Sequence, residues 1–91
     1  MKASTFKDFD DFAEFIDNYA MDKDIDDAIS GIKGEVDNVR FVDEKIDDGL
    51  DNGAYLMMRS YDIFLGDYKA YARFYYGNDD YVVTCVMVDE D

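Results

Sequence analysis

Apolar residues recur at steps of three and four through the first third of the chain, which is the spacing of an amphipathic helix. The first such stripe consists of Phe6, Phe9, Phe12, Ala13, Ile16, Tyr19 and Ala20. Ser4 or Thr5 is the expected N-cap of this helix. Phe15 falls off the apolar stripe, so we expect its side chain to be exposed.

A second helix is expected almost directly after the first. Its apolar face is made of Met21, Ile25, Ala28, Ile29 and Ile32. Asp22 or Asp24 can cap its start, because a carboxylate accepts hydrogen bonds from the free N–H groups of a first turn. Gly34 is expected at the position just past its C-terminus, where glycine is favoured.

Residues 35–52 fit two different patterns. Val39 to Val42 has the composition of a short strand, whereas Val36, Val39, Ile46 and Leu50 are also spaced as a third short helix. We favour the strand. Residues 47–53 are rich in Asp, Asn and Gly, which predicts a loop.

From Ala54 onward the pattern alternates with a period of two, which is typical of strands. We expect strands at 55–61, 68–76 and 81–88, with a turn near Gly66 and a loop at 77–80. In the last strand, Tyr81, Val83, Cys85 and Met87 are predicted to face the core, with Cys85 as a small buried apolar residue. Residues 89–91 are expected to be frayed.

These elements predict a single α+β domain over residues 1–91. Its two N-terminal helices would pack on a three- to four-stranded antiparallel β-meander and cover one face of the sheet. Tyr71 and Tyr75 would then lie on the other face or at its edge, where exposed tyrosines are candidate interface anchors.

The charge of the chain indicates what kind of partner its surface can bind. The chain has 23 acidic and 9 basic residues, a net charge of −14, and most of the acids are Asp. Such self-repulsion costs stability, and it disfavours direct binding to nucleic acid or to an anionic membrane. Residues 1–52 hold 16 acids and 6 bases, so the excess is concentrated there. The expected partner is therefore a basic protein.

The sequence offers little support for catalysis, a metal or a cofactor. It has no His and one Cys, so it lacks the usual general base and cannot form an intramolecular disulfide. Asp22, Asp24 and Asp26 match the first positions of a calcium loop, but Asp27 and Lys33 stand where Gly and Glu are required. We therefore expect a non-enzymatic protein, and the lack of a signal-like apolar run favours the cytoplasm.

Rows of carboxylates on helices can imitate a nucleic acid. Acids three and four residues apart on a helix are spaced by about 5–6 Å, which is comparable to successive phosphates of one strand. Short, stiff Asp side chains keep this charge close to the backbone. A basic groove built for DNA or RNA would attract such a track and be blocked by it.

In charge, size and element order the chain resembles the small acidic DNA-mimic inhibitors. These include phage anti-restriction and anti-CRISPR proteins, and a bacterial double-stranded-DNA-mimic family in which two helices pack on a four-stranded meander. The resemblance implies an inhibitor of a basic nucleic-acid-binding protein, such as a phage-defence nuclease or a CRISPR effector. An immunity or antitoxin protein that covers a basic toxin nuclease is the alternative. The uneven charge and the excess of Lys over Arg argue against simple salt adaptation.

The candidate contact residues follow from the acidic rows, the loop after them and the exposed tyrosines. They are Asp8, Asp10, Asp11, Glu14, Asp17, Asp22, Asp24, Asp26, Asp27, Asp43, Asp47, Asp48, Asp51, Tyr71 and Tyr75. The chain is expected to be a monomer or a homodimer, and the edge of the last strand is one place where a second copy could pair.

Overall fold

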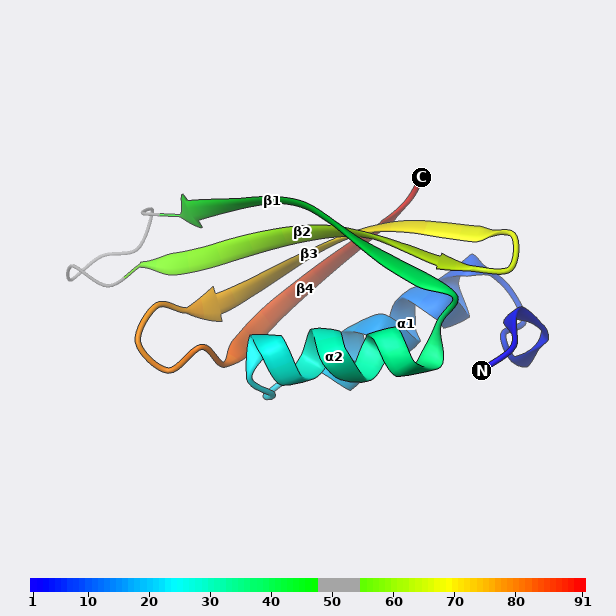
Figure 1. Cartoon of the computed structure of the whole chain (residues 1–91), viewed down its shortest axis with the longest axis horizontal. Helices are drawn as coiled ribbons and strands as arrows, with labels where there is room; N and C mark the ends of the chain where they lie inside the picture. Colours follow the sequence, from blue (N-terminus) through cyan, green and yellow to red (C-terminus); the bar gives the residue numbers. More distant parts are fainter. Residues whose placement is uncertain (48–54) are drawn as a thin grey trace.

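The computed structural model describes residues 1–47 and 55–91, and its architecture confirms the α+β prediction. Two helices precede a four-stranded antiparallel sheet with strand order β1-β2-β3-β4, so the strands form a meander (Figure 1). The helices are α1 (Phe9–Ala20) and α2 (Ile25–Glu35), and a short 3-10 turn spans Ala3–Thr5. The strands are β1 (Asn38–Asp47), β2 (Leu56–Leu65), β3 (Tyr68–Gly77) and β4 (Val83–Glu90).

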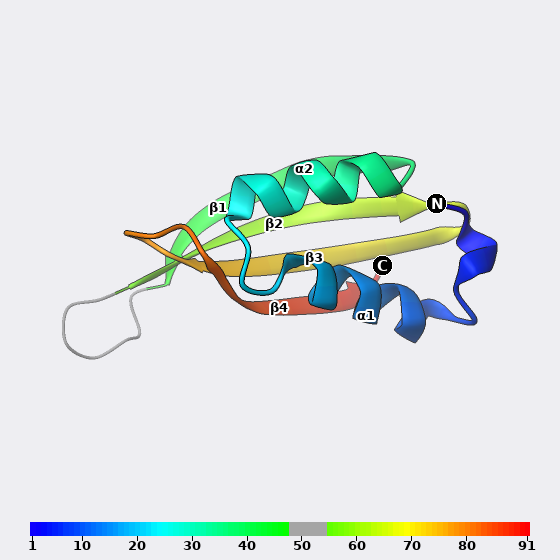
Figure 2. The same cartoon turned by 90° about the horizontal axis from the view of Figure 1, so that it is seen from below.

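Both helices lie on the same face of the sheet, side by side, with α1 along β4 and α2 towards β1 (Figure 2). The core is the layer between them and the sheet. Its largest fully buried apolar side chains come from both helices and from β2, β3 and β4. They are Phe12, Ile16, Ile25, Ile32, Ile63, Leu65, Phe74, Tyr76 and Val83. Burying them provides most of the driving force for folding.

Helix α1 begins later than the sequence pattern predicted. Its N-cap is Asp8, whose side chain accepts a hydrogen bond from the backbone N–H of Asp11 at 3.0 Å. Ser4 and Thr5 both lie within the 3-10 turn, so the prediction of either as the N-cap is wrong. Asp is as good a cap as Ser or Thr, and the first turn adds Asp10 and Asp11 at the positive end of the helix dipole.

Phe15 is half-buried rather than exposed, which corrects a second detail. Its ring packs against Phe6 and Tyr19, with centroid separations of 5.6 and 5.8 Å. The chain before α1 folds back and places Phe6 over the helix. A neighbour that lies outside the helix therefore widens the apolar stripe beyond what the helical spacing alone indicates.

Helix α2 is capped as predicted at its start but runs past its predicted end. Asp24 is the N-cap, whereas the helix continues to Glu35 and its C-cap is Val36. Gly34 therefore lies inside the last turn and not after it. The chain does not need a left-handed residue here because Val36 is extended and leads directly into β1.

Replacing Gly34 with Ala should stabilise the protein by about 0.5–1 kcal/mol, because glycine costs that much relative to alanine in a helix interior. A Cβ at Gly34 meets no atom within 4 Å. Gly31 provides a matched control in the same helix, since a Cβ there would lie 2.0 Å from Tyr19 Oη. Urea unfolding should show a gain for G34A and none for G31A. A loss for G34A would place Gly34 in a left-handed C-terminal cap after all.

The ambiguous stretch after α2 forms a single long strand. β1 spans ten residues, so the short-helix alternative is wrong and the strand extends well beyond Val42. The register with β2 shifts between Phe41 and Asp43, which leaves Val42 as a bulge. The bulge explains the mixed pattern, because one extra residue changes the phase of alternation within the strand. The predicted loop at 47–53 falls mostly outside the described residues.

β2 and β3 form the central hairpin. β2 reaches Leu65, further than predicted, and the turn near Gly66 is confirmed, with Gly66 at φ +57°. Along β3, Ala70, Ala72, Phe74 and Tyr76 are buried under the helices. Tyr71 and Tyr75 consequently point to the opposite face, as the alternation predicted.

β4 faces the core in the opposite phase from the prediction beyond Val83. Tyr75 pairs with Cys85 and Tyr76 with Val83, so Thr84 is an unpaired extra residue. After this bulge, Val86 and Val88 pack on the core, whereas Cys85 is exposed and Met87 is 46% exposed. Tyr81 lies before the strand and is also exposed. The tail is not frayed, because Asp91 donates its backbone N–H to the Lys69 carbonyl at 3.0 Å.

Candidate partner-binding surface

The connection between α1 and α2 holds the helix layer against the start of β4. The backbone N–H of Asp22 donates to the Val83 carbonyl at 3.0 Å, and the backbone N–H of Ile25 donates to the Tyr81 carbonyl at 2.8 Å. Asp22 has φ 64°, a left-handed conformation that aspartate tolerates better than most residues. These bonds fix where the acidic start of α2 lies relative to the sheet.

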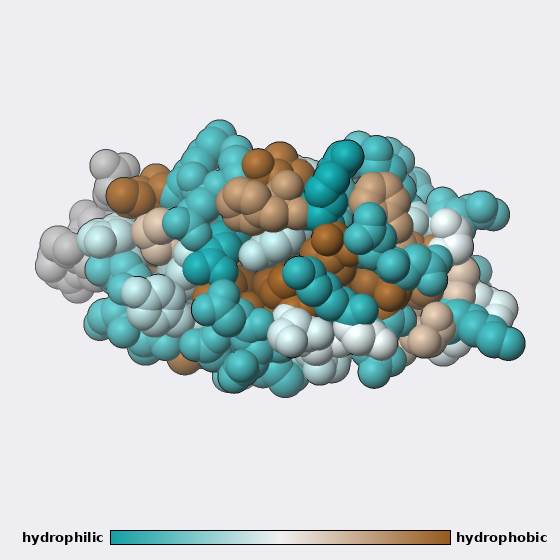
Figure 3. Space-filling model, in the orientation of Figure 1, coloured by the Kyte–Doolittle hydropathy of each residue, from teal (hydrophilic) through white to brown (hydrophobic). Residues whose placement is uncertain are grey.

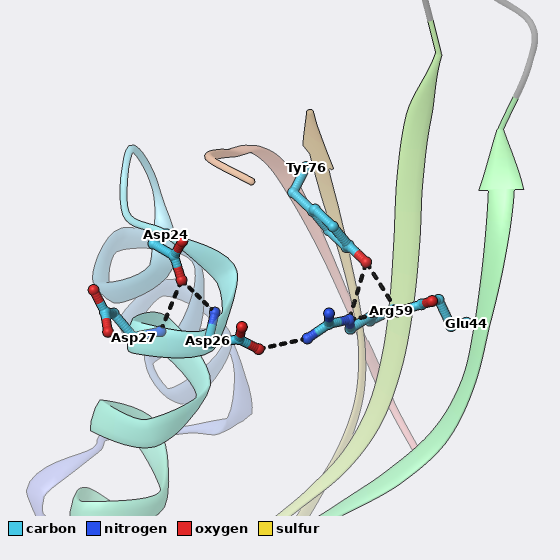
Figure 4. Close-up of polar contacts among 6 residues, drawn as sticks. All are labelled: Asp24, Asp26, Asp27, Glu44, Arg59 and Tyr76. Atoms are coloured by element: carbon cyan, nitrogen blue, oxygen red, sulfur yellow. Dashed lines mark hydrogen bonds and ion pairs between the residues drawn. The ribbon is translucent and has the colours of Figure 1, made fainter. Parts of the chain in front are cut away.

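Two acids at the start of α2, Asp24 and Asp26, have structural partners (Figure 4). The Asp24 carboxylate accepts hydrogen bonds from the backbone N–H groups of Asp26 at 2.8 Å and Asp27 at 3.3 Å. The Asp26 side chain forms an ion pair with Arg59 of β2 at 2.7 Å. Two of the predicted contact residues therefore also hold the fold together.

Arg59 connects the helix layer to two strands beneath it. Besides Asp26, its guanidinium donates to Glu44 of β1 at 2.6 Å and to the Tyr76 hydroxyl of β3 at 2.9 Å. The Tyr76 hydroxyl in turn donates to Glu44 at 2.9 Å. The hydrogen bond from Arg59 holds the pKa of Glu44 below its usual range. Burial, aided by the hydrogen bond to Glu44, raises the pKa of Tyr76 to about 12.

The lowered pKa of Glu44 predicts an acid-dependent loss of stability. A carboxyl whose pKa is depressed in the folded state contributes stability above its ordinary pKa of 4.5, and this contribution is lost as the pH falls further. Between pH 7 and pH 3, the urea midpoint should therefore fall further for the wild type than for E44Q, which keeps the hydrogen-bonding shape. E14Q, an exposed Glu to Gln change on α1, should behave as the wild type. Equal pH dependence in all three proteins would contradict the prediction.

Five carboxylates of the helix layer have no hydrogen bond or ion pair through their side chains within residues 1–47 and 55–91. They are Asp10, Glu14, Asp17, Asp22 and Asp27. Together with Asp8, Asp11, Asp24 and Asp26 they form what we call the acidic helix layer. Asp10, Glu14 and Asp17 follow one another along α1 at steps of four and three residues, so they lie in a row on its surface.

Hydrophilic residues cover much of the surface on the α2 side of the molecule, and hydrophobic residues show between this helix and the sheet (Figure 3). Of the row on α1, Asp10 and Glu14 are exposed and Asp17 is half-exposed. No lysine or arginine within residues 1–47 and 55–91 forms an ion pair with any of these three acids. A partner that approaches this side therefore meets mostly uncompensated negative charge.

The remaining candidates lie elsewhere. Asp43 and Asp47 belong to β1, and Asp43 shares the sheet face opposite the helices with Tyr71 and Tyr75. Asp48 and Asp51 fall outside the described residues. Tyr71 and Tyr75 are half-buried by their neighbours. Because the sheet separates the two groups, one flat partner surface cannot contact both at once.

Sequence reasoning missed the group formed by Glu44, Arg59 and Tyr76. Only the pairing of three strands brings these residues together, and no local spacing signals it. It also missed two exposed apolar residues of β1, Phe41 and Ile46, which are 56% and 62% exposed. They face the helix side of the sheet but lie in a strand that the helices touch only slightly.

Within the two described ranges, no three carboxylate or thiol side chains come close enough together to hold a metal ion, and no pocket is present. None of the described helices is long and apolar enough to cross a membrane. Comparisons of the chain with family models, curated proteins and solved structures gave no match. The surface of the molecule is therefore the main indication of its function.

Proposed function

We propose that this protein is a nucleic-acid-mimicking inhibitor, which binds the basic DNA- or RNA-binding surface of a target protein and blocks it. A phage-defence nuclease or a CRISPR effector is a target of the expected chemistry. The observation that carries the proposal is the acidic helix layer, in which five carboxylates have no side-chain partner among the described residues. A surface that served only solubility would gain nothing from keeping them on one face.

The rigidity of the layer supports this function. Asp8 and Asp24 cap the two helices, and Asp26 is tied to Arg59, so the backbone that carries the free carboxylates is fixed before binding. A fixed array loses little conformational entropy when it binds. The basic groove of a target would also relieve the mutual repulsion of these acids on contact.

The immunity-protein alternative requires a further anchor on the surface that bears the acids. Tyr71 and Tyr75, the tyrosines predicted as anchors, lie on the opposite face of the sheet and cannot supply it. The two functions differ in the expected partner. A mimic competes with nucleic acid for its target, whereas a toxin held through specific side-chain contacts would not be released by DNA.

Affinity capture tests the proposal. The immobilised chain should retain a DNA- or RNA-binding protein from a bacterial lysate at about 0.1 M salt and release it at higher salt, because the contact is electrostatic. Duplex DNA or RNA should displace the purified partner from the immobilised chain. The nucleic acid that the partner binds more tightly should displace it at the lower concentration. A partner that nucleic acid cannot displace would favour the immunity function. Failure to retain any nucleic-acid-binding protein would refute both.

A further inference from the structure

The sheet face opposite the helices differs from the rest of the molecule in its charge. We call it the open face, because no described helix covers it (Figure 1). Its four described basic residues are each paired with an acid: Arg40 with Asp62 at 2.5 Å, Arg73 with Asp89 at 3.2 Å, Lys69 with Asp91 at 3.4 Å and Lys45 with Asp43 at 3.6 Å. In a chain of net charge −14, this face is close to neutral.

Charge balance therefore separates the two faces by the partner that each can accept. A basic protein gains most on the acidic helix layer. Two copies of this chain, in contrast, repel one another through their helix layers, and they can approach closely only through a face that carries both signs. The open face meets this condition, and it adds the rings of Tyr71 and Tyr75, which are favourable at interfaces.

The strand register makes the open face complementary to itself. Across β2, Arg40 lies in the same row as Tyr71, Asp43 in the same row as Arg73, and Lys45 in the same row as Tyr75. A two-fold axis parallel to β2 would lay β1 of one copy over β3 of the other and keep each row aligned. In these three rows the residue from β1 then faces a suitable group on β3: a cation faces a tyrosine ring in the two outer rows, and Asp43 faces Arg73 between them. Each β2 residue faces its own copy across the axis, and the pairing with Arg40 neutralises the charge of Asp62 there.

We propose that two copies of the chain form a symmetric dimer through their open faces, with β1 of each copy over β3 of the other. The contact is isologous, so the Asp43–Arg73 pair occurs twice. Face-to-face sheets pack about 10 Å apart, a gap that the long side chains of Arg and Tyr can fill. Both acidic helix layers would remain on the outside of the dimer.

The area of the overlap sets the expected affinity. Three overlapping strands of ten residues give a flat footprint of roughly 500 Å² per copy, from a rise of about 3.3 Å and a strand spacing of about 4.8 Å. The total of about 1,000 Å² is at the lower limit for a specific interface. We therefore expect a weak, reversible dimer with a dissociation constant in the micromolar range. The proposal does not depend on the proposed inhibitory function.

Two complementary charge reversals test this geometry. D43R places like charges on both symmetric contacts of its own dimer, and so does R73D with the opposite sign. Each variant alone should lose at least about 100-fold in self-association, because like-charge contacts cost several kcal/mol. An equimolar mixture of the two should associate again, because each D43R chain then brings only arginines and each R73D chain only aspartates to the two contacts.

Sedimentation equilibrium between about 1 µM and 1 mM at about 0.15 M salt measures the association. The wild type should approach about 21 kDa, twice the chain mass of 10.5 kDa. D67R and K33D, matched reversals at exposed sites away from the open face, should associate as the wild type does. D43R loses the internal ion pair with Lys45, and R73D loses the one with Asp89. Mixing the two variants restores neither internal pair, so only a contact between copies explains recovery of association. Circular dichroism confirms that each variant is folded.

Three results would overturn the proposal. A wild type that stays at the monomer mass at every concentration excludes the dimer. A dimer that survives both D43R and R73D uses another surface, such as the free edge of β4. A mixture that fails to associate while the wild type does so excludes the pairing of β1 with β3. None of these results bears on whether the acidic helix layer binds a nucleic-acid-binding protein.

Discussion

Reversing two charges of the row on α1 should abolish binding of the target while leaving the fold intact. The double variant D10K/D17K changes the net charge from −14 to −10 and places lysines at both ends of the row around Glu14. A basic groove would then meet like charges at two points. We expect at least about 100-fold weaker binding of the nucleic-acid-binding partner, since like-charge contacts cost several kcal/mol.

The stability of D10K/D17K should be equal to that of the wild type or slightly higher. Neither Asp10 nor Asp17 forms a side-chain hydrogen bond or ion pair in the described part of the chain, so no contact is lost. A lysine at position 10 loses a favourable interaction with the helix dipole, worth about 0.3–1 kcal/mol, but it relieves repulsion from Asp11 and Glu14. The melting temperature should therefore be equal to that of the wild type or higher.

A matched control separates the row from net charge. D67K/D79K also raises the charge by four, but its positions are exposed turn residues, outside the acidic helix layer. Isothermal titration against the captured partner should give near wild-type affinity for this control and severe loss for D10K/D17K. Equal loss in both would mean that only total charge matters. Full affinity in D10K/D17K would remove the row on α1 from the contact surface.

The helix layer was predictable because its determinants are local. The apolar spacing placed Phe12 and Ile16 in the core, and the same spacing placed Glu14 on the outer surface of α1. Capping was harder, because several acids near each helix start can serve as the cap. Asp24 was among the predicted caps of α2, but the cap of α1 is Asp8, and the fold of the preceding chain decides this.

The sheet was less predictable because its details depend on partners distant in sequence. The cluster of Glu44, Arg59 and Tyr76 exists only once three strands are in register. Neither bulge could be located from the sequence, since Val42 in β1 leaves only a mixed pattern and Thr84 in β4 leaves none. Each bulge reverses which residues face the helices, so an alternation that is read correctly on one side of it is wrong on the other.

The two faces of the sheet have different consequences for association. The acids that the sequence brings together in its first third are displayed on one face, and the sheet places Arg40 and Arg73 beside acids on the other. Net charge therefore describes neither face well. It is concentrated where a basic partner would bind, and it is nearly cancelled where a second copy could pack.

The bulge in β4 predicts a large difference in the rate at which a thiol reagent reacts at two neighbouring positions of this strand. The single cysteine of the chain, Cys85, allows this to be measured. Because Thr84 is the extra residue, Cys85 faces solvent, whereas Val83 is fully buried under the helices. Cys85 should therefore react with a thiol reagent in the native protein about as fast as a free cysteine. Without the bulge, both positions would share one face and Cys85 would be protected.

The matched comparison is a chain with its only cysteine at position 83, made as V83C/C85S. A thiol buried in the core reacts only when the structure opens, and a domain that is stable by several kcal/mol opens rarely. We expect its reaction to be at least about 1,000-fold slower than that of Cys85, and to reach the same rate in urea.

Reactions are followed at about 1 µM protein, where the wild type is mostly monomeric. Because β4 lies beyond the three strands that overlap in the dimer, fast labelling of Cys85 should persist at higher concentrations. Slow labelling of Cys85 at 1 µM would place it in the core and remove the bulge at Thr84, and with it the assignment of Val86 and Val88 to the helix side of the sheet.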